Sequence, residues 1–177
     1  MNICVFCGSG AGSDPVYADA ARKLGTLMAH SSITLVYGGG NIGLMGILAD
    51  AVMNSGGKVI GIIPDFLVKK EVAHRGVTTL EIVDSMHQRK KRMADLADAF
   101  IALPGGWGTM DELAEILTWK QLGLIAHPVL LINTREFFNP LLQQMRSMMK
   151  EGFLKPEYFH FLQVTGTPEE ALSLIIP

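Results

Sequence analysis

The stretch Ile33-Thr34-Leu35-Val36-Tyr37-Gly38-Gly39-Gly40-Asn41-Ile42-Gly43 carries a short apolar run directly into a glycine-rich loop. A short run with little polar alternation is typical of a strand that is covered on both faces, as in a parallel sheet. A helix is predicted from about residue 43 to Gly56 and Gly57, and another apolar run follows over residues 58–63. Strand, glycine turn, helix and strand together predict a βαβ unit with a right-handed crossover.

The same alternation extends to both ends of the chain. Further strands are expected over residues 2–7, 79–83, 100–103 and 129–132, with a short tail after a helix at residues 140–150. Asp14-Pro15 gives a helix N-cap followed by proline at the first helical position, which predicts a helix to about residue 30. We therefore predict a single Rossmann-like, doubly wound α/β domain over residues 1–177. Its sheet is mostly parallel, with helices on both faces.

The composition restricts the possible partners. Of the 177 residues 49% are hydrophobic and 18% are charged, with a net charge of −2. Such a chain does not bind nucleic-acid polymers through charge, and its apolar runs fall short of the ~20 residues that span a membrane. The buried sheet explains part of the apolar excess. We expect the rest to cover the interface of a homodimer, with residues 110–123 and their Ile116, Leu117, Trp119 and Leu122 as contributors.

The two cysteines, Cys4 and Cys7, lie three residues apart in a predicted strand and therefore point to opposite faces. We expect both to be buried core residues rather than a redox pair or half of a zinc site. The N-terminus has no basic segment of the kind that begins a signal peptide. A cytoplasmic protein without structural disulfides is the expectation.

In open parallel sheets, ligands bind beyond the carboxyl ends of the strands. The first glycine loop, Gly38-Gly39-Gly40-Asn41-Ile42-Gly43, has the spacing GxGxxG between a strand and a helix. Glycines there let backbone N–H groups approach a phosphate at a helix N-terminus. The alternative is a tight turn that packs the helix on the strand. A dinucleotide site would also need an acid ~20 residues later, a position that Asp65 fits only loosely.

The second loop, Pro104-Gly105-Gly106-Trp107-Gly108-Thr109, follows another buried strand and precedes a helix expected to begin at Met110-Asp111-Glu112. Its glycines predict a second anion cradle at a helix N-terminus. Thr109 and Glu112 also have the spacing of a capping box, in which the glutamate would only satisfy a backbone amide. The other reading places the Glu112 carboxylate in the crevice, where its surroundings can tune its proton affinity.

A third segment, Ser85-Met86-His87-Gln88-Arg89-Lys90-Lys91-Arg92, places four cations near a helix start, where the helix dipole favours acids. An anion opposite Arg89 and Lys90 would explain this, because arginine offers a bidentate fork and lysine a point charge. Ser85 and Gln88 have capping-box spacing, which marks where the helix begins.

Taken together, residues 38–46 (GGGNIGLMG), 86–90 (MHQRK) and 104–112 (PGGWGTMDE) resemble the LONELY GUY family. Members of that family are cytokinin riboside 5′-monophosphate phosphoribohydrolases, formerly described as lysine decarboxylases. The resemblance implies a Rossmann-like homodimer that hydrolyses the N-glycosidic bond of N6-substituted AMP, or of AMP itself. The products would be the free base and ribose 5-phosphate, with no metal or other cofactor.

The resemblance also implies the site residues. The catalytic pair matches Arg89 and Glu112. Departures from the family pattern are Trp107, where Phe or Tyr is usual, and Gly10, where a serine is frequent; both bear on substrate preference. The positions that contact the nucleotide or line its pocket match Ser9, Gly38, Gly39, Gly40, Gly43, Glu71, Arg89, Lys90, Gly105, Gly106, Trp107, Gly108, Thr109, Met110, Asp111, Glu112 and Thr118.

These residue types suit the implied reaction. Cleavage of a ribosyl C–N bond builds positive charge on the sugar, as in glycoside hydrolysis. The Glu112 carboxylate could stabilise that charge and take a proton from the attacking water. Arg89 could hold the phosphate or ribose, or ease charge on the departing base. The alternatives are a nucleotide-binding protein without turnover, a pyridoxal-phosphate decarboxylase, for which no lysine has a matching setting, and an NAD-dependent enzyme.

Overall fold

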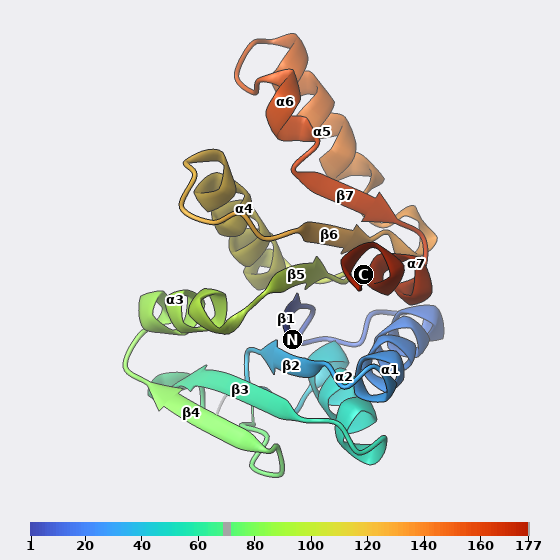
Figure 1. The fold of residues 1–177 in the computed structure, drawn as a ribbon, viewed down its shortest axis with the longest axis vertical. Helices are drawn as coiled ribbons and strands as arrows, with labels where there is room; N and C mark the ends of the chain where they lie inside the picture. The colour runs from blue at the N-terminus through green and yellow to red at the C-terminus, as the bar shows by residue number, and fades with distance from the viewer. Residues whose placement is uncertain (69–71, 177) are drawn as a thin grey trace.

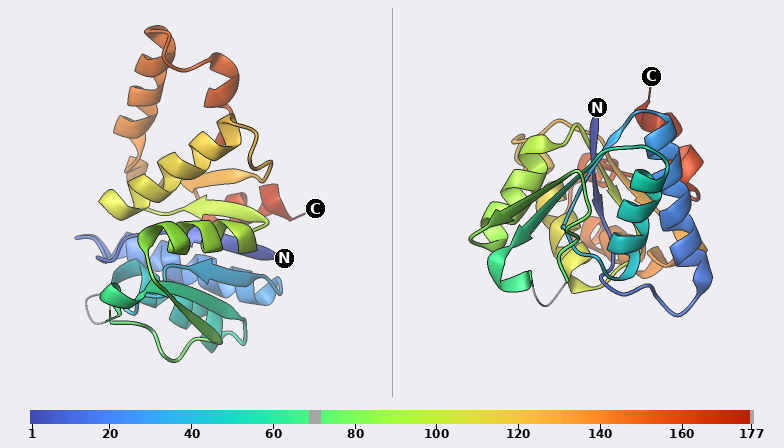
Figure 2. Two further views of the ribbon diagram at one scale, coloured as in Figure 1. Left: turned by 90° about the vertical axis from the view of Figure 1, so that its left-hand side faces the viewer. Right: turned by 90° about the horizontal axis from the view of Figure 1, so that it is seen from below.

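The computed structural model describes residues 1–68 and 72–176, and over these the chain forms a seven-stranded sheet with the order β4-β3-β2-β1-β5-β6-β7. Every strand pair is parallel. Figures 1 and 2 show the strands in one twisted sheet. The predicted Rossmann-like sheet is thus confirmed. The strands are β1 (Asn2–Phe6), β2 (Thr34–Tyr37), β3 (Val59–Pro64), β4 (Thr79–Val83), β5 (Ala99–Ala102), β6 (Val129–Ile132) and β7 (Leu162–Thr165).

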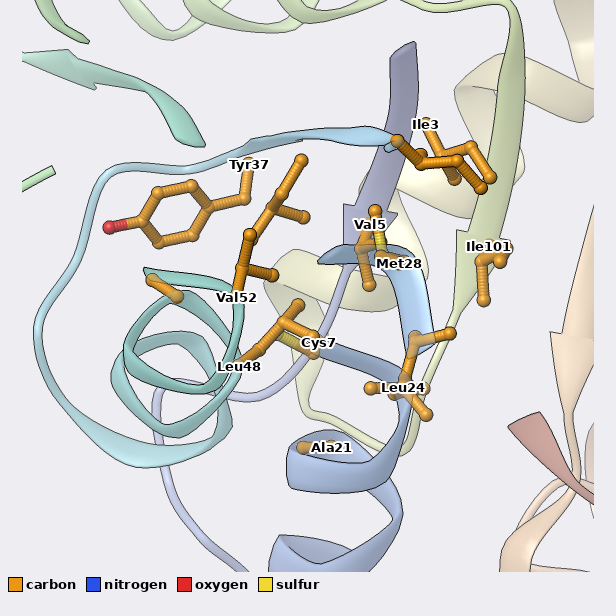
Figure 3. Packing of buried hydrophobic residues seen from close by; sticks show 14 of the residues in the cluster. Ile3, Val5, Cys7, Ala21, Leu24, Met28, Tyr37, Leu48, Val52 and Ile101 are labelled. Carbon is orange, nitrogen blue, oxygen red and sulfur yellow. The ribbon is translucent and has the colours of Figure 1, made fainter. Parts of the chain in front are cut away.

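Helices cover both faces of the sheet, so the doubly wound arrangement is confirmed as well. One core cluster packs α1, α2 and α7 on one face, and a second packs α3, α4 and α5 on the other. Figure 3 shows part of the first cluster, where Leu24, Leu48 and Val5 meet. The helices are α1 (Pro15–His30), α2 (Gly43–Asn54), α3 (Met86–Leu96), α4 (Trp107–Gln121), α5 (Asn139–Lys150), α6 (Pro156–Phe159) and α7 (Pro168–Ile175).

Local sequence signals set several of these boundaries. The Asp14 carboxylate accepts a hydrogen bond from the Val16 N–H at 3.0 Å, and Pro15 opens α1 as predicted. Cys4 and Cys7 are buried in the clusters on opposite faces of the sheet, also as predicted. No described helix has both the length and the apolar character needed to span a bilayer.

Two predictions about the chain's elements were wrong. The region after residue 150 is not a tail, because α6, β7 and α7 follow there and β7 extends the sheet. β7 is an edge strand in which Gln163 and Val164 are exposed, so it lacks the continuous apolar run of the inner strands. Helix α4 begins at Trp107 instead of Met110, because Gly106 is extended and serves as its N-cap.

The strand order places the ligand crevice. β1 lies between β2 and β5, so the chain winds outward in opposite directions on its two sides. Ligands bind at such a switch point, beyond the carboxyl ends of the strands. Phe6 and Ala102, the last residues of β1 and β5, are paired in register. The loops that leave these two strands, over residues 7–13 and 103–106, therefore open side by side.

Candidate active site

A polar pocket of about 120 Å³ lies at the switch point between these two loops. Its walls come from the loop after β1, the first turns of α4, and single side chains of α2 and α3. Two ionisable side chains from different helices, Arg89 and Glu112, meet in it. The lining residues are Cys7, Gly8, Ser9, Met45, Arg89, Gly106, Trp107, Gly108, Thr109 and Glu112.

Arg89 is fixed by two backbone carbonyls, one within β3 and one directly after β2. Its Nη2 donates to the Gly38 carbonyl oxygen at 2.6 Å, and its Nε donates to the Ile62 carbonyl oxygen at 3.1 Å. The residue is only 4% exposed. A Cβ atom at position 38 would lie 2.2 Å from Nη2, so glycine is required there to admit the guanidinium. The site therefore contains a buried cation whose position is set by β2 and β3.

Glu112 is 9% exposed and lies one turn beyond Thr109 in α4. Because Gly106 is the N-cap and no side chain caps this helix, the capping-box reading of Thr109 and Glu112 was wrong. Thr109 instead packs beneath Gly105, where an added Cβ would meet its Oγ1 at 2.1 Å. The predicted cap at α3 is confirmed, since the Ser85 hydroxyl accepts from the Gln88 N–H at 3.2 Å.

The thiols beside the pocket are held in the protonated form. Burial raises the pKa of Cys7 far above its ordinary value, and the charge of Glu112 raises it further. Burial and then Glu112 also raise the pKa of Cys4, from the other side of β1. Since a thiolate is the reactive form of cysteine, neither thiol is suited to act as a nucleophile.

The first glycine loop supports the pocket from outside and does not line it. Gly43 has φ 60°, and a Cβ there would lie 2.3 Å from the backbone of Ser9. The Leu44 N–H, at the start of α2, donates to the Gly8 carbonyl at 3.0 Å. Of the two readings of residues 38–43, a phosphate-binding loop and a tight packing turn, the contacts favour the packing turn. The Gly38 carbonyl accepts a hydrogen bond from Arg89, and Gly43 packs against Ser9.

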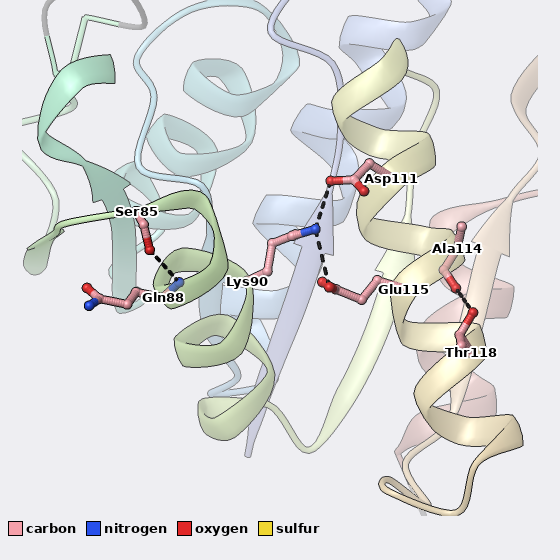
Figure 4. A network of polar contacts seen from close by, with 7 residues as sticks. All are labelled: Ser85, Gln88, Lys90, Asp111, Ala114, Glu115 and Thr118. Atoms are coloured by element: carbon pink, nitrogen blue, oxygen red, sulfur yellow. Dashed lines mark hydrogen bonds and ion pairs between the residues drawn. The ribbon is translucent and has the colours of Figure 1, made fainter.

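Lys90 points away from the pocket, toward α4. Its Nζ donates to Asp111 at 3.0 Å and lies 3.3 Å from Glu115, as Figure 4 shows. Burial alone would lower the pKa of Lys90, but the hydrogen bonds to the two carboxylates outweigh it and raise the pKa above its ordinary value. The positive charge of Lys90 is therefore engaged within the chain.

The remaining predicted site residues are dispersed. Met110 and Thr118 line a separate apolar groove of about 300 Å³ between α4 and the α5–α6 region, where the Thr118 hydroxyl donates to the Ala114 carbonyl at 2.7 Å. Trp107 stands at the rim of the polar pocket with 91% of its surface exposed. Glu71 lies outside the described residues. Gly39 and Gly40 pack near Ile63 and Ala73 instead.

Three lining residues, Cys7, Gly8 and Met45, are absent from the site residues that the resemblance implies. Gly8 lies in the loop after β1, where the rule for parallel sheets places a ligand, and Cys7 directly precedes it. Met45 had no signal, because its place in the first turn of α2 reaches the pocket only through the packing of that helix.

The fold and site define a Rossmann-like α/β protein whose crevice joins a glycine-bounded helix N-terminus to a buried arginine and glutamate. A family model described as "possible lysine decarboxylase" matches residues 45–175. The chain belongs to this family, the LONELY GUY family that its motifs resemble.

Named relatives cover nearly the whole chain. A cytokinin riboside 5′-monophosphate phosphoribohydrolase of Arabidopsis thaliana, LOG1, is 49% identical to this chain. The alignment covers 97% of this chain and 80% of the length of that protein. The enzyme of that name from Rhodococcoides fascians is 48% identical over 88% of this chain and 79% of its own. The molybdenum cofactor carrier protein of Chlamydomonas reinhardtii superposes with a TM-score of 0.74 at 21% identity, over 98% of this chain and 94% of that one. This last similarity concerns the fold alone.

Proposed function

We propose that this chain hydrolyses the N-glycosidic bond of adenosine 5′-monophosphates, including N6-substituted ones, to free base and ribose 5-phosphate. The observation that carries the proposal is the meeting of buried Arg89 and Glu112 in one pocket at the N-terminus of α4. The curated relatives, 46–49% identical, bear the name of this activity. We propose that residues 1–177 act as one nucleotide-binding domain.

The pocket suits the sugar phosphate. The first N–H groups of α4, from Trp107 onward, have no partner within the helix and carry its positive dipole end, which favours a phosphate. Gly106 and Gly108 leave the backbone uncovered there, because no atom lies within 4 Å of a Cβ placed at either residue. Binding energy from the phosphate can then be used at the ribosyl carbon.

In the proposed reaction, water attacks the anomeric carbon while the C–N bond breaks and its electron pair leaves with the base. Positive charge develops on the sugar ring and is stabilised by the Glu112 carboxylate, which accepts the water proton. The departing base takes one proton from solvent at a ring nitrogen, and Glu112 afterwards releases the water proton to solvent. Arg89, held by the carbonyls of Gly38 and Ile62, places its positive charge beside the phosphate or the ribose hydroxyls.

The setting of Lys90 does not suit it to form the Schiff base of a decarboxylase. Such a lysine must reach its neutral amine form, which a lowered pKa favours. Lys90 is the described lysine closest in sequence to the site residues, and its pKa is raised by Asp111 and Glu115.

We also propose that the chain acts as a homodimer, with a second copy covering the groove that contains Thr118. Leu122 and Leu124, at and just after the end of α4, are exposed, as is Phe153 on the groove itself. The expected contribution of Ile116 was wrong, because its side chain is buried in the chain's own core. Thr118 and Glu112 line different pockets of one chain, and we propose that the second copy brings its Thr118 to the nucleotide. A monomeric mass at micromolar concentration would contradict this.

The hydrolase is tested by incubating the protein with AMP and with N6-isopentenyl-AMP and following base release by chromatography. We expect release from at least one nucleotide, and little from the nucleosides, which lack the phosphate. Glu112→Gln should reduce kcat by roughly 10²–10⁴-fold. Tight nucleotide binding without product over hours would instead support a binding protein, and full activity of Glu112→Gln would exclude the mechanism.

A further inference from the structure

The three consecutive glycines of the first loop help to position Arg89 but have no side chains to hold their own backbone. The Gly38 carbonyl accepts a hydrogen bond from the Arg89 Nη2 at 2.6 Å, and Gly39 follows with φ 76°. Because glycine adopts many backbone conformations at similar free energy, the local sequence only weakly determines where such a carbonyl points. Contacts from outside the glycine run are therefore needed to keep it directed at the guanidinium.

Residues 72–74 form a short strap that runs antiparallel to this loop. Two backbone hydrogen bonds and one bridge join them: the Asn41 N–H to the Val72 carbonyl at 3.0 Å, the His74 N–H to the Gly39 carbonyl at 2.9 Å, and Gly40 with Ala73. The glycine run is thus paired with the strap directly after the carbonyl that holds the guanidinium.

Backbone preference does not explain the course of the strap. Val72 has φ 47°, a conformation that β-branched residues rarely adopt. A strained residue persists only where its surroundings hold it in place. Val72 does not anchor the strap by packing, because it is 52% exposed. The buried polar side chain of the strap is that of His74, which is 7% exposed.

His74 connects the strap to α2. Its Nε2 lies 2.9 Å from Oδ1 of Asp50, and because an ionised carboxylate only accepts hydrogen bonds, Nε2 is the donor. Asp50 lies about two turns after Gly43, where α2 begins and the glycine loop ends. The histidine therefore bonds the loop through its backbone and the helix after the loop through its ring. Burying a polar side chain costs free energy unless it is hydrogen-bonded, so an apolar residue would serve a purely packing role better.

We infer that His74 is a positioning residue for the active site, which acts on Arg89 through the Gly38 carbonyl. The Asp50–His74 pair fixes the strap, the strap fixes the glycine loop, and the loop holds the guanidinium in the polar pocket with Glu112. This inference rests on the proposed function for the reaction that Arg89 serves. It extends the functional residues to a pair that is not among the described lining residues of the pocket.

The first test compares two amides of different length at position 74. His74→Gln places an amide nitrogen near the position of Nε2, whereas His74→Asn places it one methylene short of Asp50. We expect His74→Asn to lower kcat/KM for AMP roughly 10–100-fold, the scale of a small displacement in an active site. His74→Gln should stay within about threefold of wild type. Equal values for the two variants would overturn the role of this bond.

Asp50→Ala removes the same bond from the side of α2 and leaves the strap's own residues intact. The Asp50 side chain is 56% exposed, so this variant should fold even if a change at the buried histidine prevents folding. Its kcat/KM should fall as in His74→Asn. Asp19→Ala is the matched control, because it takes another exposed helical aspartate from its partner, Arg22, and should leave activity unchanged. Unchanged activity of Asp50→Ala would contradict the inference.

A double-mutant cycle separates positioning from general support of the fold. If His74 acts through Arg89, adding His74→Asn to Arg89→Lys should lower kcat/KM by less than about twofold beyond the single change. If the histidine only supports the fold, the losses of the two single variants should multiply. Multiplied losses would therefore overturn the positioning role.

Amide hydrogen exchange tests the strap without any reaction. The N–H groups of Asn41 and His74 should exchange at least about tenfold faster in Asp50→Ala than in wild type or Asp19→Ala. Unchanged exchange would overturn the inference whether or not the chain is a hydrolase. If the wild type binds AMP but releases no base, the proposed hydrolase fails, and the Kd of AMP in the same variants then decides the positioning role. If AMP does not bind, both proposals fail.

Discussion

The two glycine loops of this protein are similar in sequence, but their glycines have different surroundings and different roles. In the first, residues 38–43, the glycines are required by the chain's own atoms: Gly38 admits the Arg89 guanidinium, and Gly43 packs against the backbone of Ser9. In the second, Gly105 is required by Thr109, but no atom lies within 4 Å of a Cβ placed at Gly106 or Gly108. Both of these residues line the polar pocket.

This difference separates glycines that support the fold from glycines that serve ligand binding. A glycine with crowded surroundings is explained by the fold, whereas a glycine facing open space beside a pocket is explained by what must approach it. On this reading the first loop positions the site and the second contacts the ligand. Substitutions that change stability without activity, or activity without stability, test this division.

The largest effect is expected from Arg89→Lys, where the first loop meets the site. A lysine ammonium lacks the planar fork with which two nitrogens of the guanidinium donate to the Gly38 and Ile62 carbonyls at once. We expect kcat/KM for AMP to fall by roughly 10²–10³-fold, the scale of one lost preorganised donor. Arg92→Lys is the matched control, since Arg92 lies one turn along α3 in an exposed pair with Glu81. Comparable losses in both variants would contradict the role given to Arg89.

Gly43→Ala tests the supporting loop through stability. The alanine would have to adopt φ 60° and would place its Cβ 2.3 Å from the Ser9 backbone. We expect a loss of about 3 kcal/mol in the free energy of unfolding, in the range of strained substitutions. For a chain of this size that lowers Tm by roughly 6–12 °C, which thermal unfolding followed by circular dichroism measures. A Tm within about 2 °C of wild type would show that the loop is not under this constraint.

Gly108→Ala should give the opposite pattern. The position is helical and its added methyl meets nothing within 4 Å, so replacing glycine should stabilise the fold by roughly 0.4–1 kcal/mol. The same methyl enters the pocket and should raise KM for AMP about tenfold, equivalent to ~1.4 kcal/mol of lost binding. The pair of measurements is Tm and steady-state kinetics. An unchanged KM would place Gly108 among the structural glycines.

The fold could be predicted largely because its inner strands carry unambiguous patterns. Fully buried runs such as residues 129–132 have few other interpretations, and the Asp14-Pro15 cap determined the start of α1. β7 was not predicted, because an edge strand exposes part of its residues and its sequence pattern therefore resembles that of a loop. The start of α4 was misplaced because its N-cap, Gly106, has no side chain that could mark a helix start in the sequence.

For the site, the motifs identified residues but not where they point. The pairing of Arg89 with Glu112 came from a resemblance, and the structure brings the two to one pocket. The opposite orientation of Lys90, the next residue along α3, follows from helix geometry together with the two acids on α4.

The smallest effect is expected from Lys90→Met, which removes the link between α3, the helix of Arg89, and α4, the helix that follows the second loop. The folded-state pKa of Lys90 is raised, so its stabilising contribution is complete below the ordinary lysine pKa of about 10.4 and is lost as pH rises through the raised value. Because Asp111 is exposed, we expect a cost of about 1 kcal/mol or less. That cost should be constant from pH 6 to pH 9 in urea unfolding and shrink above about pH 10.4.

KM for AMP should change by less than about threefold, since the charge is already engaged by Asp111 and Glu115. A tenfold rise in KM without loss of stability would instead mean that Lys90 leaves these acids to bind the phosphate, and the division between a supporting and a contacting loop would then have to include α3.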